Sequence, residues 1–413
     1  MSAARGPLHG IRVLDLSRIL AAPLVAQMLG DLGADVVKVE RPGAGDDSRR
    51  YGPPFLHDGD GEPTNDAGFY LACNRNKRSI TVDHSTPAGA QIIADLAARA
   101  DVLIENFRSG VLAKYGLDHE TLRGANPGLV YCSITGFGQD GPYAQRPGYD
   151  GVFQAMSGMM SVSGVPDGEP GAGPMKVGVS MVDILTSLYA GNAILSALWH
   201  RDTTENGEGQ HIDMSLLDCG LASLSHYAQN YLISGAAAPR RGNGGFGGIP
   251  SQTFTGSDGE EFFLVASTPA QWRGVADALE RPDLLTDERF ADVSARIANR
   301  DVVIETLDRA FAARPAREWV DLLEARDVPV SPVNDMDGVF ANPQIRHRNM
   351  RMTIEHPVAG PIDLLRNPIV LGSTPITDYA PPPTLGQHTR EVLATELGMS
   401  DEQIDKLVAD RTV

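Results

Sequence analysis

The chain has 413 residues and a formal net charge of −18, with hydrophobic residues at 42% and charged residues at 21%. This composition is ordinary for a folded globular protein, and the length is sufficient for two domains with separate cores. The negative charge argues against nucleic acids and anionic membrane surfaces as partners. No uninterrupted apolar run reaches the roughly 18 residues that a membrane span needs.

Cysteine and histidine usage gives no sign of a metal centre or a disulfide framework. The three cysteines are too few and too scattered for either, and the ten histidines contain no HExxH-like spacing. The opening residues, MSAARGPLHG, have no apolar signal-peptide core. We therefore predict a cytoplasmic enzyme without a bound metal.

The charge is unevenly distributed. Residues 1–114 carry 13 Lys or Arg against 14 Asp or Glu, so nearly all of the net negative charge lies later in the chain. Unless this distribution arises by chance, an anionic ligand is expected to bind in the first part, where it is repelled least.

Short strands alternate with helical segments over the first third of the chain. The predicted strands cover residues 10–17, 35–40, 79–83, 101–107 and 129–137. A helix is predicted over 19–34, and another begins near Thr86 with Pro87 at its first position. Such strand–helix–strand units favour a parallel sheet. The first strand is followed by LSRILAAP rather than GxGxxG, so the fold is Rossmann-like without a dinucleotide fingerprint, which argues against an NAD-linked oxidoreductase.

A long apolar helix is predicted in KVGVSMVDILTSLYAGNAILSALWH, residues 176–200. Ser180 is the expected N-cap, which puts Asp183 in the first turn, near free backbone N–H groups and the positive end of the helix dipole. A carboxylate there is expected to stay ionised, and the same N–H groups could stabilise an oxyanion formed on an acylated aspartate. A purely structural acid in a first turn fits this position as well.

The alternation ends after about Leu216. A Gly-rich loop, RRGNGGFGGIPSQ, precedes a predicted hairpin over 253–267 and amphipathic helices up to about Ala325. Two prolines make 327–335 an expected extended linker.

These elements predict an α/β protein with a smaller inserted α+β domain. The small domain is expected over 216–335, and the large domain over 1–215 and 336–413. The chain ends in a helix that Ser400 and Gln403 open as a capping box.

Six segments occur in an order found in one known family. They cover residues 10–49, 74–83, 101–118, 136–158, 176–200 and 207–219. Together with the ending LGQHTREVLATELGMSDEQIDKL, they resemble the class III CoA-transferases, the family of formyl-CoA transferase and carnitine CoA-transferase, which also includes the α-methylacyl-CoA racemases. The resemblance spans nearly the whole chain. It implies a large domain made of both chain ends, and a homodimer of interlocked rings with the active site between domains and subunits.

The resemblance implies that Asp183 is the nucleophile, carrying an aspartyl-CoA thioester. Racemases of the family have a His in the segment that here reads Gly148-Tyr149-Asp150, and Tyr is a poor base at neutral pH. Tyr149 instead resembles the aromatic residue that transferases carry beside CoA, and Asp150 a second acid that orients Asp183 or the acyl group. A core tyrosine, with Asp150 capping the next helix, remains the alternative.

Four residues match family positions that line the CoA channel. They are Arg41, near the adenosine end, and Asn106, Phe107 and Lys114. A basic side chain can contact a CoA phosphate by charge alone, although a basic residue taken singly is more often a solvated surface charge.

The Gly-rich loop resembles one that covers the aspartyl intermediate in formyl-CoA transferase. Gly244, Gly245, Gly247 and Gly248 allow positive φ and close approach to a ligand, and a lid of this kind shields an anhydride from water. The alternative is an ordinary flexible loop. Phe246 interrupts the glycine run, which disfavours an oxalate-type substrate.

Arg75 in NRNKRS and Arg49 in GDDSRR are the predicted ligands of a substrate's second carboxylate. The arginine in NRNK and the loop sequence resemble members acting on four- to six-carbon dicarboxylates, whose distal carboxylate an arginine can bind bidentately. Pairing with surface acids such as Asp46 or Asp47 is the structural alternative.

We therefore predict transfer of CoA from an acyl-CoA such as succinyl-CoA to a carboxylic acid, with CoA as substrate and no permanent cofactor. A racemase or epimerase of the same family, and a non-catalytic CoA-binding protein, are the alternatives.

Overall fold

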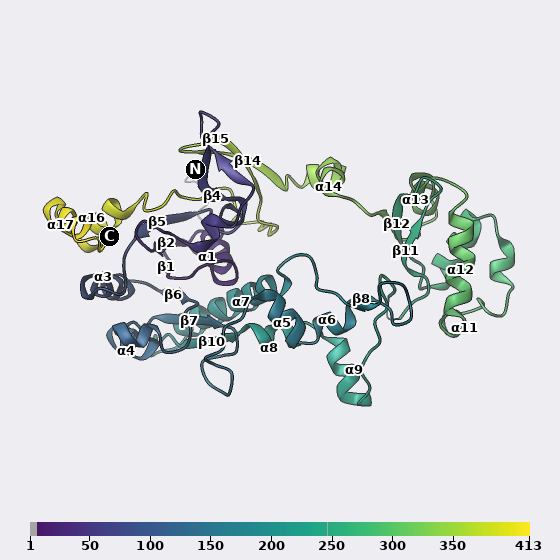
Figure 1. Ribbon diagram of the computed structural model, residues 1–413, viewed down its shortest axis with the longest axis horizontal. Helices are drawn as coiled ribbons and strands as arrows, with labels where there is room; N and C mark the ends of the chain where they lie inside the picture. Colours follow the sequence, from purple (N-terminus) through teal and green to yellow (C-terminus); the bar gives the residue numbers. More distant parts are fainter. Residues whose placement is uncertain (1–5, 246) are drawn as a thin grey trace. The chain divides into compact units, whose positions relative to one another are not determined.

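The computed structural model describes residues 6–245 and 247–413, and the chain divides into two compact units (Figure 1). The large unit comprises Met1–Met159, Lys176–Ala236 and His347–Val413, and the small unit comprises Met160–Met175 and Ala237–Arg346. The large unit is thus built from both chain ends. The small unit begins later than the sequence-based limit of 216, and it also includes a short segment before the long helix.

A six-stranded parallel sheet forms the centre of the large unit, as the sequence predicts. Its strands are β1 (Arg12–Asp15), β2 (Asp35–Glu40), β5 (Lys77–Thr81), β6 (Val102–Glu105), β7 (Val130–Thr135) and β10 (His211–Ser215). They lie in the order β10-β7-β6-β1-β2-β5, and each neighbouring pair is parallel. The chain runs outward from β1 to β5 and then returns to β6 on the other side of β1. Ligands of such sheets bind at the carboxyl ends of the strands beside this reversal.

Helices cover both faces of the sheet. One face packs against α1 (Ala21–Asp31) and α7 (Met181–Thr203). The other packs against α3 (Pro87–Ala97) and the C-terminal helices α16 (Thr389–Leu397) and α17 (Asp401–Ala409). The predicted capping signals are confirmed: the Thr86 hydroxyl accepts the Gly89 N–H at 3.0 Å, and Ser400 and Gln403 form a capping box.

Helix α7 is long and apolar enough to cross a membrane by length and composition, although the sequence contains no uninterrupted apolar run of that length. Its Val182, Ala190 and Ile194 are buried in the core that α7 shares with α1 and the sheet. We therefore assign α7 as a core helix of the large unit.

The small unit contains an antiparallel sheet, in the order β11-β12-β13, and a set of helices. The strands are β11 (Ser251–Thr255), β12 (Glu261–Val265) and β13 (Val330–Pro332), and the helices are α10 (Pro269–Ala278), α11 (Val293–Ala298), α12 (Arg300–Phe311) and α13 (Ala316–Glu324). The hairpin of β11 and β12 is confirmed. The prediction of an extended linker over 327–335 is partly wrong, because residues 330–332 pair with β12 as an edge strand, a position where proline is tolerated.

Shorter elements complete the chain. They are β3 (Phe55–His57), β4 (Pro63–Ala67), β8 (Gly164–Val165), β9 (Gly173–Pro174), β14 (Arg351–His356), β15 (Gly360–Leu365), α2 (Gly68–Leu71), α4 (His119–Ala125), α5 (Asp150–Met156), α6 (Met159–Val162), α8 (Leu216–Ala222), α9 (His226–Ser234), α14 (Met336–Ala341), α15 (Pro343–His347), and the 3-10 turns η1 (Asp47–Arg50), η2 (Leu112–Tyr115) and η3 (Pro282–Leu285).

Candidate active site

Asp183 lies in the first turn of α7, as the sequence predicts, and its side chain is partly buried. The residues on either side of it anchor the helix. Val182 is fully buried in the large core, and the Ser187 hydroxyl lies 2.8 Å from the Asp183 carbonyl and 2.6 Å from the Ala21 carbonyl of α1. The backbone that carries Asp183 is therefore held on a rigid element.

Asp150 caps α7 from a different helix. One of its carboxylate oxygens accepts the N–H groups of Val182 at 2.8 Å and Asp183 at 3.3 Å. The other accepts a hydrogen bond from the Gln154 amide at 2.7 Å. Ser180 is the N-cap residue by position, but its side chain makes no capping bond. Asp150 performs the capping that was predicted for Ser180.

This cap overturns two expectations about Asp183. The first-turn N–H groups are already bonded, since Asp150 accepts two of them and the Ser180 carbonyl accepts that of Ile184 at 3.1 Å. They are thus not available to an oxyanion. Burial, and then the negative charge of Asp150, raise the pKa of Asp183 to about 7 instead of keeping it low. Burial is the larger cause, and the carboxylate of Asp150 adds to it by offsetting the positive end of the helix.

Tyr149, the residue before α5, is 66% exposed, which does not fit the alternative of a core tyrosine. Nor does Asp150 cap α5, the helix that it begins, because its carboxylate caps α7. A second exposed tyrosine, Tyr51, lies close by. Burial, and then the charge of Tyr149, raise the pKa of Tyr51. No sequence motif marks Tyr51, which lies on an irregular segment.

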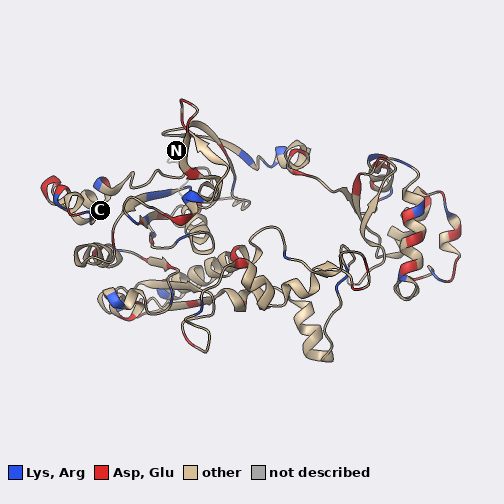
Figure 2. Cartoon of the chain, in the orientation of Figure 1, with Lys and Arg blue, Asp and Glu red and all other residues tan. Residues whose placement is uncertain are grey.

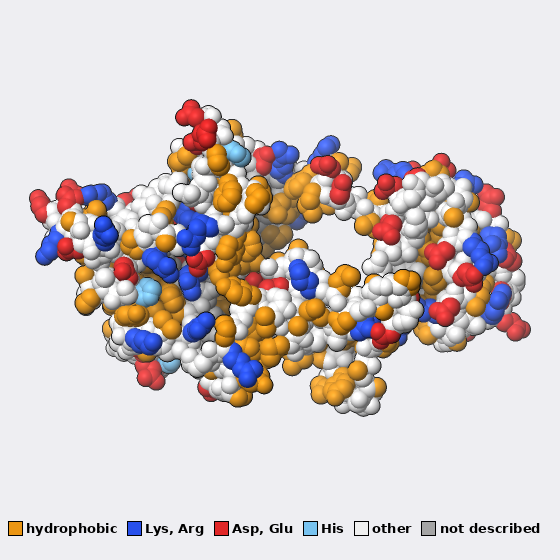
Figure 3. All heavy atoms as spheres, viewed as in Figure 1, with side chains coloured by type: hydrophobic (Ala, Val, Ile, Leu, Met, Phe, Trp, Pro, Cys, Tyr) orange, Lys and Arg blue, Asp and Glu red, His pale blue; other side chains and the backbone are white. Residues whose placement is uncertain are grey.

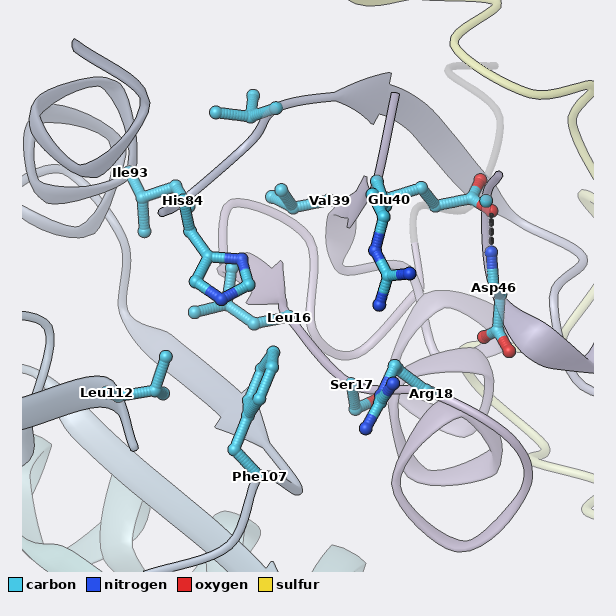
Figure 4. Close-up of a pocket in the computed structure, with 13 residues that line it drawn as sticks. Leu16, Ser17, Arg18, Val39, Glu40, Asp46, His84, Ile93, Phe107 and Leu112 are labelled. Carbon is cyan, nitrogen blue, oxygen red and sulfur yellow. Dashed lines mark hydrogen bonds between the residues drawn. The ribbon is translucent and has the colours of Figure 1, made fainter. Parts of the chain in front are cut away.

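A pocket opens at the carboxyl ends of β1, β2 and β6 (Figure 4). Its apolar wall includes Leu16, Val39, Ile93, Phe107 and Leu112, and its polar wall includes Arg18, Arg41 and His84. This is the edge of the sheet where the strand order reverses, the usual ligand position in such folds.

Aromatic rings and guanidinium groups meet in this pocket. The His84 ring lies edge-on to Phe107 at 5.1 Å and to Tyr115 at 5.3 Å, and the Arg18 guanidinium lies 5.4 Å from the Phe107 ring centre. Burial lowers the pKa of His84, and the nearby arginines Arg41 and Arg18 lower it further. A flat ring flanked by positive charge suits a heteroaromatic base that carries phosphates.

The four residues predicted to line a CoA channel have different positions. Phe107 and Arg41 line the pocket. The Asn106 side chain instead donates a hydrogen bond to the Arg18 carbonyl at 2.7 Å and accepts one from the Arg18 N–H at 2.9 Å. It therefore shapes the pocket indirectly. Lys114 lies exposed on η2. Arg18 and His84 were missed because neither lies in a charged or aromatic cluster in the sequence.

The Gly-rich loop lies in the small unit, and most of its glycines are explained by packing rather than by backbone angles. A Cβ on Gly245 would lie 2.5 Å from the Ser251 hydroxyl, and one on Gly248 would collide with the Ser267 side chain. Gly247 faces open space. Among the described residues of the loop only Gly242 has a positive φ, so the expectation of positive φ at the other glycines is wrong. The prediction that concerns Phe246 lies outside the described residues.

Arg49 and Arg75 are both buried, and each is bonded to acids of the fold. The Arg49 guanidinium donates to both oxygens of Glu40 at 2.7 and 2.8 Å and to Asp66, and also to the Tyr70 hydroxyl. Arg75 is paired with both oxygens of Asp31. These contacts oppose the predicted substrate role of the two arginines and favour a structural one, although with other acids than Asp46 and Asp47.

Within residues 6–245 and 247–413, no cluster of three or more His, Cys, Asp or Glu side chains is placed to hold a metal ion.

A sequence model of CoA-transferase family III matches residues 8–389. The chain belongs to this family. It is a class III CoA-transferase, an enzyme whose substrates are CoA thioesters.

Named relatives and a solved structure agree with this assignment. The succinate–glutarate CoA-transferase of Agrobacterium fabrum is 44% identical over 394 residues, which are 95% of this chain and 96% of that protein. The succinyl-CoA:glutarate CoA-transferase of Homo sapiens is 40% identical over 98% of this chain and 89% of its own. A CAIB/BAIF family protein from Brucella suis matches with a TM-score of 0.84 at 43% identity, over 95% of this chain and 100% of that one.

Proposed function

We propose that this CoA-transferase moves CoA from a dicarboxyl-CoA, such as succinyl-CoA, to a second dicarboxylic acid. The observation that carries the proposal is the similarity to a succinate–glutarate CoA-transferase, at 44% identity over 95% of the chain. A relative named as a succinyl-CoA:mesaconate CoA-transferase, 36% identical over 94% of the chain, supports the same substrate class.

The proposed mechanism uses Asp183 as the nucleophile. Its carboxylate attacks the thioester carbonyl, the carbon–sulfur bond breaks, and a mixed anhydride and CoA thiolate form. The thiolate then attacks the Asp183 acyl carbon, which releases the first acid and leaves an aspartyl-CoA thioester. The second acid then attacks the aspartyl-CoA thioester, which releases the thiolate and forms a new mixed anhydride. The thiolate attacks the acyl carbon of the second acid, so the new acyl-CoA leaves and the free Asp183 carboxylate returns.

Three features of the fold support these steps. Asp183 has a pKa of about 7, so a large fraction is ionised and nucleophilic at neutral pH. The pocket at the ends of β1, β2 and β6 has the rings and arginines that a CoA nucleotide needs. The exposed Tyr149 is available to pack against CoA, and the Gly-rich loop is the proposed cover that keeps water from the anhydride.

Trapping of the intermediate tests the mechanism. Incubation with an acyl-CoA and hydroxylamine should leave a hydroxamate on the peptide that contains Asp183, identified by mass spectrometry. A screen of donor acyl-CoAs against carboxylic acids then tests the substrate class. Transfer confined to monocarboxylic acids would contradict the dicarboxylate proposal while leaving the mechanism intact.

An acyl-CoA racemase of the same family is the second candidate. Tyr149 stands where that branch has a His, and a tyrosine is a poor exchangeable base at neutral pH. Exchange of an α-proton in deuterated water, without an acceptor acid, would favour the racemase.

A homodimer is proposed from apolar side chains that the single chain leaves exposed. On α7 these are Leu188, Tyr189, Leu195 and Trp199, and on α9 they are Tyr231, Leu232 and Ile233. Figure 3 shows apolar side chains gathered over α9, a helix without a buried residue. A second copy of the chain is the occupant that the family resemblance implies. A monomeric mass measured by light scattering at micromolar concentration would contradict the proposed dimer.

A cytoplasmic location stays a prediction, and cell fractionation would test it.

A further inference from the structure

Arg300 is the first residue of α12, and its guanidinium lies against the Gly-rich loop. A Cβ on Gly244 would collide with the Arg300 Nη2 atom, so glycine is required for the loop to lie over this side chain. Nη2 also donates a long hydrogen bond, 3.3 Å, to the Gln252 side chain of β11. The arginine and the loop therefore form one packed assembly within the small unit.

Arg300 forms no ion pair among the described residues, and the adjacent Asp301 offsets only part of its charge. Within the described residues no carboxylate lies within ion-pair distance of it, and its Nη1 atom is shielded from solvent without a hydrogen-bond partner. Two other arginines of the same cavity do have acids, since Arg240 pairs with Asp167 and Arg309 pairs with Glu305. A buried donor without an acceptor is costly, and a bound anion would satisfy it.

Two further sources of positive charge lie beside Arg300. Burial lowers the pKa of Arg300, and the neighbouring charge of Arg241 lowers it further, so the two guanidinium groups are close. The N-terminus of the 12-residue α12 contributes the positive end of a helix dipole, and Asn299 provides no side-chain cap there. A cation at a helix N-terminus is unfavourable by itself, and Asp301 in the first turn does not outweigh burial and Arg241, since the pKa of Arg300 stays lowered. A bound anion would make the arrangement more favourable.

The shape and the rim of the cavity favour a carboxylate over a phosphate. The cavity has a volume of about 910 Å³, which is ample for a four- or five-carbon acid. Asp301, Glu305 and Asp308 line it as well, and the red and blue segments of α12 in Figure 2 mark its acidic and basic residues. These acids would repel a dianionic phosphate more strongly than a single carboxylate.

We propose that Arg300 binds the second carboxylate of the dicarboxylate substrate, beside the Gly-rich loop and the start of α12. The proposal rests on the proposed function, in which this loop covers the acyl group. It assigns to Arg300 the role that the sequence predicted for Arg49 and Arg75, whose guanidinium groups already bind Glu40, Asp66 and Asp31. A guanidinium can bind both carboxylate oxygens at once, which would also give Nη1 an acceptor.

The test compares glutarate with pentanoate, an acid of equal length that lacks the second carboxylate. In a two-stage exchange, kcat/KM for the acceptor reports only the step after the aspartyl thioester has formed. R300Q should lower kcat/KM for glutarate by about 10- to 100-fold and that for pentanoate by less than about threefold. R300K keeps the charge but not the planar fork, so it should recover only part of the loss.

Arg309→Gln is the matched control, because it removes an arginine of the same cavity that already has an acid partner. Its ratio of kcat/KM for the two acids should equal that of the wild type. Equal losses on both acids in R300Q, or no loss on glutarate, would overturn the proposal while leaving dicarboxylate transfer intact. Circular dichroism verifies that each variant is folded.

A binding measurement separates this proposal from the proposed function. Calorimetric titration of the whole enzyme with glutarate should show binding that R300Q weakens at least about tenfold. Binding of inorganic phosphate that depends equally on Arg300 would identify a phosphate site and overturn the carboxylate proposal. Wild-type enzyme that binds glutarate through Arg300 but never transfers CoA to a dicarboxylate would refute only the proposed function.

Discussion

Helix α7 of the large unit begins under the carboxylate of Asp150, whereas helix α12 of the small unit begins with Arg300 and has no side-chain cap. Both helix starts are positive by virtue of their backbone dipoles. At α7 the fold supplies the anion, so burial and then the charge of Asp150 raise the pKa of the neighbouring Asp183 to about 7. At α12 the fold adds a cation, Arg300, whose charge the first-turn Asp301 offsets only in part, so the helix start can still bind an anionic ligand. The charge that a helix start offers to a substrate therefore depends on the side chains placed there, not on the helix alone.

The largest expected effect is on catalysis at the start of α7. Asp183→Ala should lower CoA transfer by about 10,000-fold or more, because it removes the proposed covalent carrier. Steady-state assays with succinyl-CoA and glutarate measure this loss. Turnover within about tenfold of the wild type would mean that the capped helix start has no catalytic role.

Asp183→Asn offers a structural control at the same position. The pKa of Asp183 in the folded state, about 7, exceeds the ordinary value of an aspartic acid, about 3.8. The ionised form therefore disfavours folding, increasingly as the pH rises from about 4 to 7. The Asn variant should accordingly be more stable than the wild type at pH 8, by about 1–3 kcal/mol, and this gain should disappear near pH 4. Thermal unfolding across this pH range measures it.

Arg49 provides the contrast to Arg300, since its acids belong to the fold. Arg49→Gln leaves Glu40 and Asp66 buried without their cation, so it should lower the free energy of unfolding by about 3–5 kcal/mol. Urea denaturation measures the loss. The neighbouring Arg50, exposed and paired with Asp47, is the control, and Arg50→Gln should change stability by less than about 1 kcal/mol. Similar small effects of both substitutions would remove the contrast.

Substitution of Asp150 tests how its negative charge affects Asp183 at the start of α7. Asp150→Asn keeps a capping oxygen but removes the negative charge that helps to raise the pKa of Asp183. In the wild type, kcat/KM for the acyl-CoA donor should rise with pH through about 7, because the ionised carboxylate of Asp183 is the proposed nucleophile. The variant should show the same rise at a lower pH, by up to about one unit, with a loss of about 1 kcal/mol in stability. A shift to higher pH would contradict the proposed coupling.

The smallest expected effect is on stability at α12. Arg300→Gln should raise the free energy of unfolding of the ligand-free enzyme by about 0.3–1 kcal/mol, because it removes a cation from a helix N-terminus. Addition of glutarate should stabilise the wild type more than this variant. A loss of more than about 1 kcal/mol in R300Q without ligand would show that Arg300 serves the fold, as Arg49 does.

Much of the fold could be predicted from local patterns in the sequence. Apolar strands and amphipathic helices repeat with characteristic periods, so the strands β1, β2, β5, β6 and β7 and the long helix α7 were expected near their observed limits, whereas β3 and β4 were not. The helix signals at Thr86 and Ser400 act over three residues and were likewise confirmed. The same local logic puts Asp183 in a first turn, and the ordered segments were sufficient to suggest the family.

Only the tertiary structure decided which side chains meet. Asp150 caps α7 across 33 positions of sequence, the Arg49 guanidinium bonds Pro383 across 334, and Val330–Pro332 becomes an edge strand because β12 lies beside it. A sequence period reports which face of an element is apolar, but it does not report which element will pack there. The sequence thus determined the main elements and the place of the proposed nucleophile, whereas the packing of distant segments decided the pKa of Asp183 and which arginines already have partners. That is so because pKa values and ion pairs depend on separations of a few ångströms that only the folded chain defines.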